Sequence, residues 1–262
     1  MRKGKITQKV GQEHRNAMMK LIDKFQNQFN IWQVWDDLMY MSAAALSQPC
    51  QWVQAREDEY MRRINRYPEN LQPLFPQMFA EIALAFEQEG FNDILGSMYM
   101  ELELGNHWRG QFFTPYYVCL MMSKIICGNP KGEIKKNGFI SVNDPTCGGG
   151  AMLIAAAQYC FEQEVNYQKN VLFVGQDIDL VVARMCFIQL SLLGCSGYVI
   201  IGNSLTQPAT GHVLFPISDD DLDVWYTPMF FSDIWHYRRI FEQVRSVAEL
   251  SNKNEEKEED NE

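Results

Sequence analysis

The chain has 262 residues, 47% of them hydrophobic, and its formal net charge is -10. A chain of this size can bury a sizeable core, as one large domain or two small ones. Its acidic balance argues against tight unaided binding to a polyanion, because neutralised phosphates supply most non-specific nucleic-acid affinity. We therefore expect any DNA contact to be weak for this chain alone, and to be local or shared with a protein partner.

The cysteines and the N-terminus indicate a cytoplasmic protein without a membrane partner. The seven cysteines form no CxxC pair, and the first residues lack the apolar segment of a signal peptide. No uninterrupted apolar run reaches the roughly 18 residues that a membrane span requires. The four histidines are scattered without metal-ligand spacing, so no metal is assigned.

Residues 8 to about 104 place apolar side chains at helical spacing, as in Ile31, Val34, Trp35 and Leu38. Prolines punctuate the middle of this region. The pattern predicts a helical N-terminal domain over residues 1–104, built of four or five helices. Its apolar stripes are interpreted as core, with an interface to a partner as the alternative.

From about residue 105 the pattern changes to short apolar runs that alternate with helical segments. Strands are predicted at residues 139–145, 171–179, 197–205 and 222–228, and helices at residues 151–164, 181–194 and 232–250. This alternation predicts an α/β domain over residues 105–250 with a parallel, doubly wound sheet. Residues 251–262 hold six acidic residues and two lysines, which predicts a solvated, disordered acidic tail.

The segment NDPTCGGG, at residues 143–150, lies where the first strand meets its helix. Glycines at such a turn let a ligand approach the backbone, and the helix amino end offers free N–H groups. Asp177 and Asn203 follow the next two strands and suit a ribose and an exocyclic amine. The segment lacks GxGxxG and a Walker lysine, while Asp144 suits a cationic ligand such as S-adenosylmethionine. The alternatives are a structural turn, a solvated Asp177 and an Asn203 that caps its own turn.

Four blocks occur together: GQFFTPYYV at residues 110–118, DPTCGGGAML at 144–153, GQDIDLVVARMCFIQLSLLG at 175–194 and GNSL at 202–205. In this order and spacing they resemble the adenine-N6 DNA methyltransferases. The likeness is greatest to modification subunits of type I restriction systems and their phage or mobile-element relatives. The resemblance covers about residues 95–230 and implies a class I, Rossmann-like fold that uses S-adenosylmethionine in DNA modification.

The resemblance also implies roles for individual residues. Phe113 and Thr114 would hold the methionine end of the cofactor. Asp177, with Ile178 beside it, would bind the ribose, and Asn203, with Ser204, would bind the adenine. The main cradle would be formed by Asp144, Thr146, Cys147, Gly148 and Gly150. Asn203 stands where the family usually has Asp, and a nucleophilic role for Cys147 is not expected.

The expected catalytic tetrad is degenerate. Family members carry [ND]-P-P-[YF] after the fourth strand, and Thr227, Pro228, Met229 and Phe230 align with it. The first proline and the aromatic ring are kept, but Thr227 is too short to reach a flipped adenine as Asn does. Core packing at the strand end is the alternative for these residues. We expect the later strands and a target-recognition domain to be missing, and therefore a truncated sheet.

Two functions are compatible with these patterns. The first is an adenine-N6 DNA methyltransferase that transfers the methyl group directly from the sulfonium to a flipped adenine. The second is a catalytically inactive relative that acts as a regulatory or anti-restriction interaction module. The intact cofactor motifs favour cofactor binding under either hypothesis.

Overall fold

The computed structural model describes residues 2–102, 114–217 and 223–259. Its main sheet has the strand order β1-β2-β3-β6. The strands are β1 (Ile140–Asp144), β2 (Val171–Asp177), β3 (Ser196–Ile201) and β6 (Asp223–Tyr226). β1, β2 and β3 run parallel to one another. The predicted Rossmann-like α/β fold is confirmed, and its sheet is mainly parallel.

The direction of the fourth strand was predicted wrongly, because β6 runs antiparallel to β3. Asp223 pairs with Ile201, and Tyr226 pairs with Tyr198. The described part of the connection contains a small hairpin, β4 (Thr210–His212) with β5 (Phe215–Ile217), and no helix. A parallel return requires a crossover of a dozen or more residues, usually a helix, whereas this connection brings the chain back antiparallel.

Burial differs sharply between β1 and its neighbours. Every residue of β3, and all of β2 except Asp177, is buried, as expected for parallel strands covered on both faces. β1 instead alternates between half-buried and exposed residues. Among the described strands it pairs with β2 alone. Within the part of the chain that the structure describes, β1 is therefore an edge strand with one open side.

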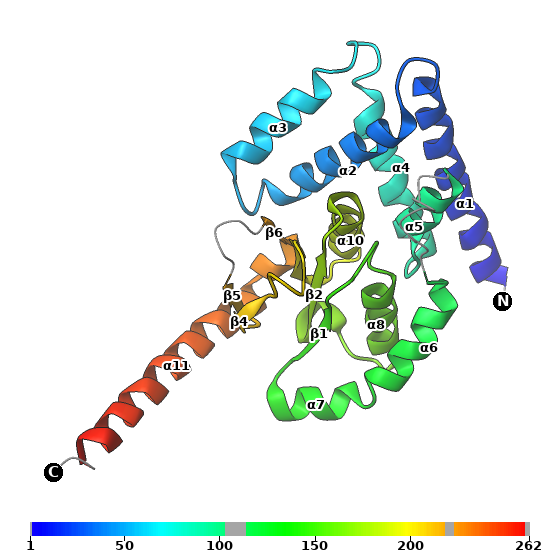
Figure 1. Cartoon of the computed structure of the whole chain (residues 1–262). Coiled ribbons are helices and arrows are strands. Elements are labelled where there is room, and N and C mark those ends of the chain that lie inside the picture. Colours follow the sequence, from blue (N-terminus) through cyan, green and yellow to red (C-terminus); the bar gives the residue numbers. More distant parts are fainter. Residues whose placement is uncertain (1, 103–113, 218–222, 260–262) are drawn as a thin grey trace.

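Helices and loops cover the two faces of the sheet (Figure 1). α8 (Ala151–Glu162) and α10 (Leu180–Leu192) share a core with alternate residues of β2, such as Val171 and Phe173. On the other face, Leu172 and Val174 pack with Leu214 of the hairpin and Trp235 of α11 (Asp233–Glu259). The period-2 alternation along β2 therefore sorts its side chains between two cores.

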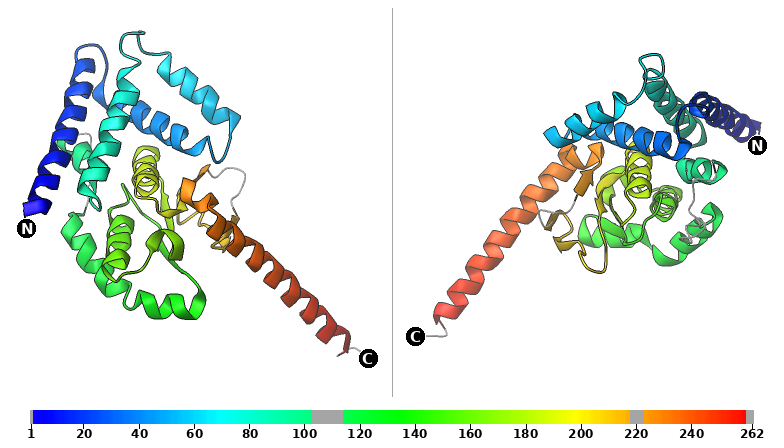
Figure 2. Two further views of the ribbon diagram at one scale, coloured as in Figure 1. Left: turned by 180° about the vertical axis from the view of Figure 1, so that it is seen from behind. Right: turned by 45° about the horizontal axis from the view of Figure 1, so that its top comes forward.

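The structure differs from the expectation of a disordered tail after residue 250. α11 continues to Glu259 and projects away from the body of the protein (Figures 1 and 2). Glutamate and lysine are good helix formers, so an acidic composition does not by itself end a helix. Residues 260–262 lie outside the described residues.

The helical N-terminal region is present, with five α-helices in its described part. They are α1 (Arg2–Ile22), α2 (Ile31–Ser47), α3 (Gln54–Ile64), α4 (Leu74–Glu89) and α5 (Ile94–Glu101). A 3-10 turn, η1 (Asp23–Phe25), follows α1. One hydrophobic core runs from Trp35 and Leu38 of α2 to Phe187 of α10. The helical region therefore shares its core with the α/β region.

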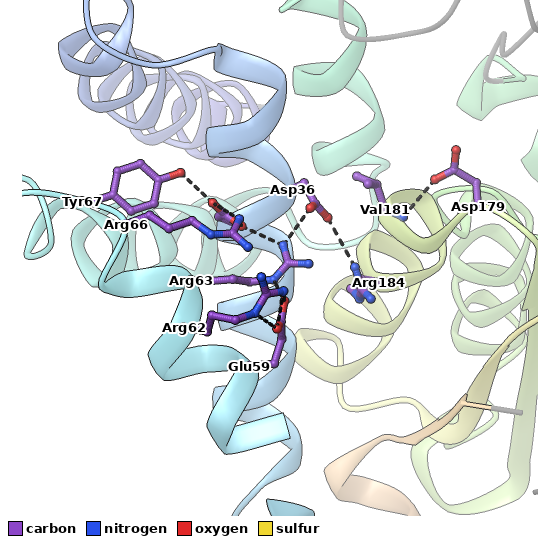
Figure 3. A network of polar contacts seen from close by, with 10 residues as sticks. Asp36, Glu59, Arg62, Arg63, Arg66, Tyr67, Asp179, Val181 and Arg184 are labelled. Carbon is purple, nitrogen blue, oxygen red and sulfur yellow. Dashed lines mark hydrogen bonds and ion pairs between the residues drawn. The ribbon is translucent and has the colours of Figure 1, made fainter. Parts of the chain in front are cut away.

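A buried polar network joins α2 and α3 to α10 (Figure 3). Asp36 accepts a hydrogen bond from Arg63 at 2.7 Å and one from Arg184 at 3.3 Å. Asp37, which is fully buried, accepts from Arg63 at 2.8 Å and from the Tyr67 hydroxyl at 2.7 Å. Burial lowers the pKa of Arg184. Removing one partner of such a network would leave a buried charge uncompensated, which is strongly destabilising.

Arg56 of α3 makes a second connection between the helical region and the sheet. Its guanidinium lies 3.9 Å from the ring centroid of Trp225 in β6. It also donates to the Val224 carbonyl at 2.7 Å and to Asp223 at 3.1 Å. These contacts hold the antiparallel strand against α3.

Three further helices complete the α/β region: α6 (Tyr116–Ile126), α7 (Pro130–Asn137) and the short α9 (Tyr167–Asn170). α6 packs beside α8. None of the helices in the described residues combines the length and apolar composition of a membrane span.

Candidate functional site

The glycine turn, residues 147–150, connects β1 to α8 at the carboxyl edge of the parallel strands. Gly148 and Gly150 have positive φ angles, of 51° and 94°. A Cβ on Gly150 would lie 2.8 Å from Cys186 Sγ, so both conformation and space require glycine there. No side chain caps α8 at Gly150. The turn therefore presents bare backbone beside an uncapped helix amino end, where an anionic group is favoured.

Asp177, at the end of β2, fixes the glycine turn from one side. Its Oδ2 accepts a hydrogen bond from the Gly148 N–H at 2.8 Å, and its Oδ1 accepts from the Asp179 N–H at 2.9 Å. The Cys147 N–H also donates to the Gln176 carbonyl at 3.0 Å. A carboxylate has about four acceptor positions, so Asp177 keeps capacity for a ligand hydroxyl.

Asp144 ends β1 next to Asp177. Its Oδ1 accepts from the Thr146 N–H at 3.1 Å. Burial raises the pKa of Asp144, and the negative charge of Asp177 adds to the rise, while the Thr146 hydrogen bond opposes it. Two carboxylates at adjacent strand ends make this edge suited to a ligand that carries positive charge and hydroxyls.

Cys147 contributes to the glycine turn through its backbone N–H and carbonyl, which bond to Gln176 and Gly150. It is buried, and its free thiol lies within hydrogen-bonding reach of the Cys186 thiol. This contact and burial raise the pKa of Cys147 well above the usual range. A thiol held neutral in this way is a poor nucleophile.

Gln189 and Asp93, which the sequence analysis missed, support the glycine turn from its buried side. Gln189 of α10 is fully buried, and its Nε2 donates to the Gly149 carbonyl at 2.6 Å and to Asp93 Oδ1 at 2.9 Å. Its Oε1 accepts from the Leu95 N–H at 3.0 Å. The signals were a lone glutamine in an otherwise apolar helix stretch and an Asp that caps α5.

The remaining predicted cofactor residues are placed as follows. Ile178 follows Asp177 and is 67% exposed. Asn203 follows β3, and its Oδ1 accepts from the Leu205 N–H at 2.9 Å, so it caps its own turn. Thr114 and Thr146 are exposed and Ser204 is half-buried, whereas Phe113 lies outside the described residues. The strand ends bring Ile178 and Asn203 to the same edge as Asp144, because β2 and β3 are adjacent and parallel.

The predicted catalytic tetrad is not at this edge. Because β6 is antiparallel, Thr227 lies beside Gly197 near the start of β3, whereas Asp177 pairs with Ile201 at its end. Gly197 and Ile201 are four residues apart along β3, which corresponds to about 13 Å at the usual rise of a strand. The structure therefore does not bring the tetrad together with the cofactor residues.

The side chains of residues 227–230 serve the core instead. Thr227 is fully buried, and its Oγ1 accepts from the Gly197 N–H at 3.0 Å and donates to the Cys195 carbonyl at 2.8 Å. Phe230 is buried against Tyr198 and Tyr226. Pro228 and Met229 are half-buried in the short 3-10 turn η3 (Pro228–Phe231). This arrangement matches the alternative of core packing.

Two cavities border β1. One of about 280 Å³ lies beside Asp144, between α6, β1 and α8. Another of about 920 Å³ lies at the opposite end of β1, where Phe139, His212 and Arg238 help to line it. The larger cavity is remote from the glycine turn, so size alone does not mark the site.

The glycine-rich turn and the acidic residues at adjacent parallel strand ends have the layout of doubly wound α/β folds, a class in which nucleotides bind at this edge of the sheet. The family model of the N-6 DNA methylases matches residues 91–259, from just before α5 to the end of α11. The chain therefore belongs to the N-6 DNA methylase family. This confirms the resemblance stated from the four sequence blocks.

Solved structures give weaker similarities. A Listeria monocytogenes protein assigned provisionally to the class I S-adenosylmethionine-dependent methyltransferases is 14% identical, with a TM-score of 0.43 over 87% of this chain and 77% of that one. The type I restriction-modification methyltransferase subunit of Streptococcus thermophilus is 19% identical, with a TM-score of 0.34. That match covers 67% of this chain and 41% of the subunit, less than half its length. No curated protein matches the chain.

Proposed function

We propose that the chain binds S-adenosylmethionine at the carboxyl edge of β1, β2 and β3, as a member of the N-6 DNA methylase family acting in DNA modification or restriction. The observation that carries this proposal is the pair of carboxylates around the glycine turn. Asp144 ends β1, and Asp177 ends β2 while bonding to the turn through Gly148. Both lie where the fold class binds nucleosides.

The residues at this edge suit the chemical groups of the cofactor. Asp144 would pair with the ammonium group, and Asp177 would accept hydrogen bonds from the ribose hydroxyls. The uncapped start of α8 would receive the carboxylate. Exposed Ile178 would contact the adenine face, and Asn203 with Ser204 its edge; Phe113, Thr114, Thr146, Cys147 and Gly150 complete the proposed cradle. The bound cofactor would supply a methyl group on a sulfonium centre.

Calorimetric titration with S-adenosylmethionine and S-adenosylhomocysteine tests the proposal. We expect micromolar binding, about 8 kcal/mol, and loss of at least roughly tenfold in the Asp144→Ala, Asp177→Ala double variant. Asp58→Ala removes an exposed carboxylate of α3 and serves as the control, with unchanged affinity expected. Absence of binding to the unmodified chain, shown folded by circular dichroism, would refute the proposal.

A second candidate function is cofactor binding without methyl transfer by this chain alone, as a regulatory or anti-restriction module. The specific observation in its favour is the burial of Thr227 and Phe230 at the opposite end of the sheet from Asp177. DNA and a protein subunit are the proposed partners under either function. DNA methylation assays on adenine-containing duplexes, with Thr227→Asn combined with Met229→Pro, separate the two.

We expect no methylation of adenine from this double variant, since both positions remain remote from the cofactor edge. A substantial gain of adenine methylation would favour the enzyme over the inactive relative. Measuring S-adenosylmethionine affinity in the same preparation distinguishes an inactive site from a misfolded one.

A further inference from the structure

We propose that Gln189 is a positioning residue of the cofactor site, and that with Asp93 it couples the start of α5 to the conformation of the glycine turn. The inference rests on the proposed function for its effect on cofactor affinity. Gln189 touches neither the open edge nor either carboxylate of the cradle in the contacts described above. It acts through the backbone of Gly149.

The peptide group between Gly149 and Gly150 is fixed at both ends. Its carbonyl accepts from Gln189 Nε2 at 2.6 Å, and its N–H donates to the Cys147 carbonyl at 2.8 Å. The preceding part of the turn is held by Asp177 through the Gly148 N–H. β2 and α10 therefore each supply one side chain that orients the bare backbone of the turn.

Gln189 simultaneously holds the amino end of α5. Its Oε1 accepts from the Leu95 N–H at 3.0 Å, and its Nε2 donates to Asp93 Oδ1 at 2.9 Å. Asp93 also caps α5 by accepting from the Gly96 N–H at 3.0 Å. One buried amide thus satisfies polar groups of two backbone segments that are more than fifty residues apart in sequence.

The burial of this cluster makes its bonds difficult to replace. Gln189 is 0% exposed and Asp93 is 5% exposed, so water has little access to compensate a lost contact. An apolar side chain at position 189 would leave the Gly149 carbonyl, the Leu95 N–H and the Asp93 carboxylate each without this partner. Unsatisfied buried groups reorient or open the backbone that carries them, so the turn and α5 are expected to loosen together.

Gln189→Met tests the coupling, because methionine keeps the length and helix propensity of glutamine without its amide. Gln158→Met is the matched control: Gln158 lies on α8 after the same turn, but bonds to Tyr116 and Glu162. Two quantities are measured: affinity for S-adenosylmethionine by calorimetry, and hydrogen exchange of the backbone amides in residues 94–97 and 147–151.

We expect Gln189→Met to weaken cofactor binding roughly tenfold and to accelerate hydrogen exchange of the backbone amides in both segments. Gln158→Met should change neither by more than about twofold. A second pair of variants, at Asp93, keeps the test decisive if Gln189→Met does not fold. Asp93→Asn keeps an acceptor oxygen and should stay close to the unmodified chain, whereas Asp93→Ala should reproduce the loss.

Affinity and exchange in Gln189→Met that match the unmodified chain would overturn the inference, as would equal losses in Asp93→Asn and Asp93→Ala. Exchange that rises only in residues 147–151 would also refute the coupling to α5. Should the unmodified chain bind no cofactor while both segments still loosen together, the proposed function fails and the coupling stands.

Discussion

Asp177 accepts a hydrogen bond from the Gly148 N–H at 2.8 Å, and so ties the end of β2 to the turn that follows β1. Its other oxygen accepts from the Asp179 N–H. One carboxylate therefore orients backbone from two loops at the edge where a nucleoside would bind.

Asp177→Asn is expected to lower the free energy of unfolding by about 1–2 kcal/mol, because the new NH₂ group must face one of the two N–H donors. Cofactor affinity should fall as well. Urea denaturation and calorimetric titration measure the two effects. A variant with unchanged stability would contradict the role of both oxygens as acceptors.

The raised pKa of Asp144 predicts that cofactor binding depends on pH. Burial and the charge of Asp177 raise this pKa above its ordinary value of 3.8, so protonation begins at a higher pH than for an exposed aspartate. Affinity for S-adenosylmethionine should fall as pH decreases through the raised pKa, since the neutral carboxyl no longer attracts the ammonium. Titrations from neutral pH down towards the ordinary value of 3.8 should show this loss in the unmodified chain and a flat, weaker profile in Asp144→Asn.

The stability of the free protein depends on pH in the opposite direction to the cofactor affinity. A carboxyl with a raised pKa binds its proton more tightly when folded, so its contribution to stability is greatest below 3.8 and is lost as pH rises through the folded pKa. Asp144→Asn should therefore gain stability relative to the unmodified chain at neutral pH.

Gly150→Ala separates backbone strain from steric exclusion when it is compared with Gly90→Ala. Both glycines have positive φ, at 94° and 70°. A Cβ at position 90 meets open space, whereas one at position 150 lies 2.8 Å from Cys186 Sγ. We expect about 1–2 kcal/mol of destabilisation for Gly90→Ala and clearly more for Gly150→Ala, measured by chemical denaturation. Equal losses would argue against the close contact with α10.

Thr227→Val tests whether this residue serves the core. The substitution keeps the shape but removes the hydroxyl that joins Cys195 and Gly197. Stability should fall by about 1–3 kcal/mol, while cofactor affinity should stay unchanged because Thr227 lies at the far end of the sheet. A loss of affinity without a loss of stability would instead indicate that the residue belongs to the cofactor edge.

Much of the fold was predictable because local patterns determine it. Apolar runs such as VLFVGQD define buried strands, and the glycines after Asp144 define the turn. The direction of β6 was not predictable, because a four-residue strand has the same pattern whichever way it runs. Strand direction depends on the connection before it, and that connection lacks the helix in its described part. The same reversal separated Thr227 from Asp177, so the error in topology was also an error about the site.

The parts of the site that the sequence analysis missed share a different cause. Gln189 and Asp93 are more than ninety residues apart, and their meeting depends on how α5 packs on α10. A single glutamine in an apolar helix gives no sign of its partner. The shared edge of Asp144 and Asp177 was predictable because the ends of parallel strands lie together, whereas tertiary packing of helices leaves no such periodic signal.

The open side of β1 determines from where the cofactor edge could be completed. Unpaired N–H and C=O groups of an edge strand accept another strand by hydrogen bonding. A strand added there in parallel would end beside Asp144, so the residues that followed it would reach the proposed cofactor site directly. A strand added antiparallel, as β6 is at the opposite edge of the sheet, would place its final residues at the far end of the sheet. Those residues would not reach the proposed cofactor site.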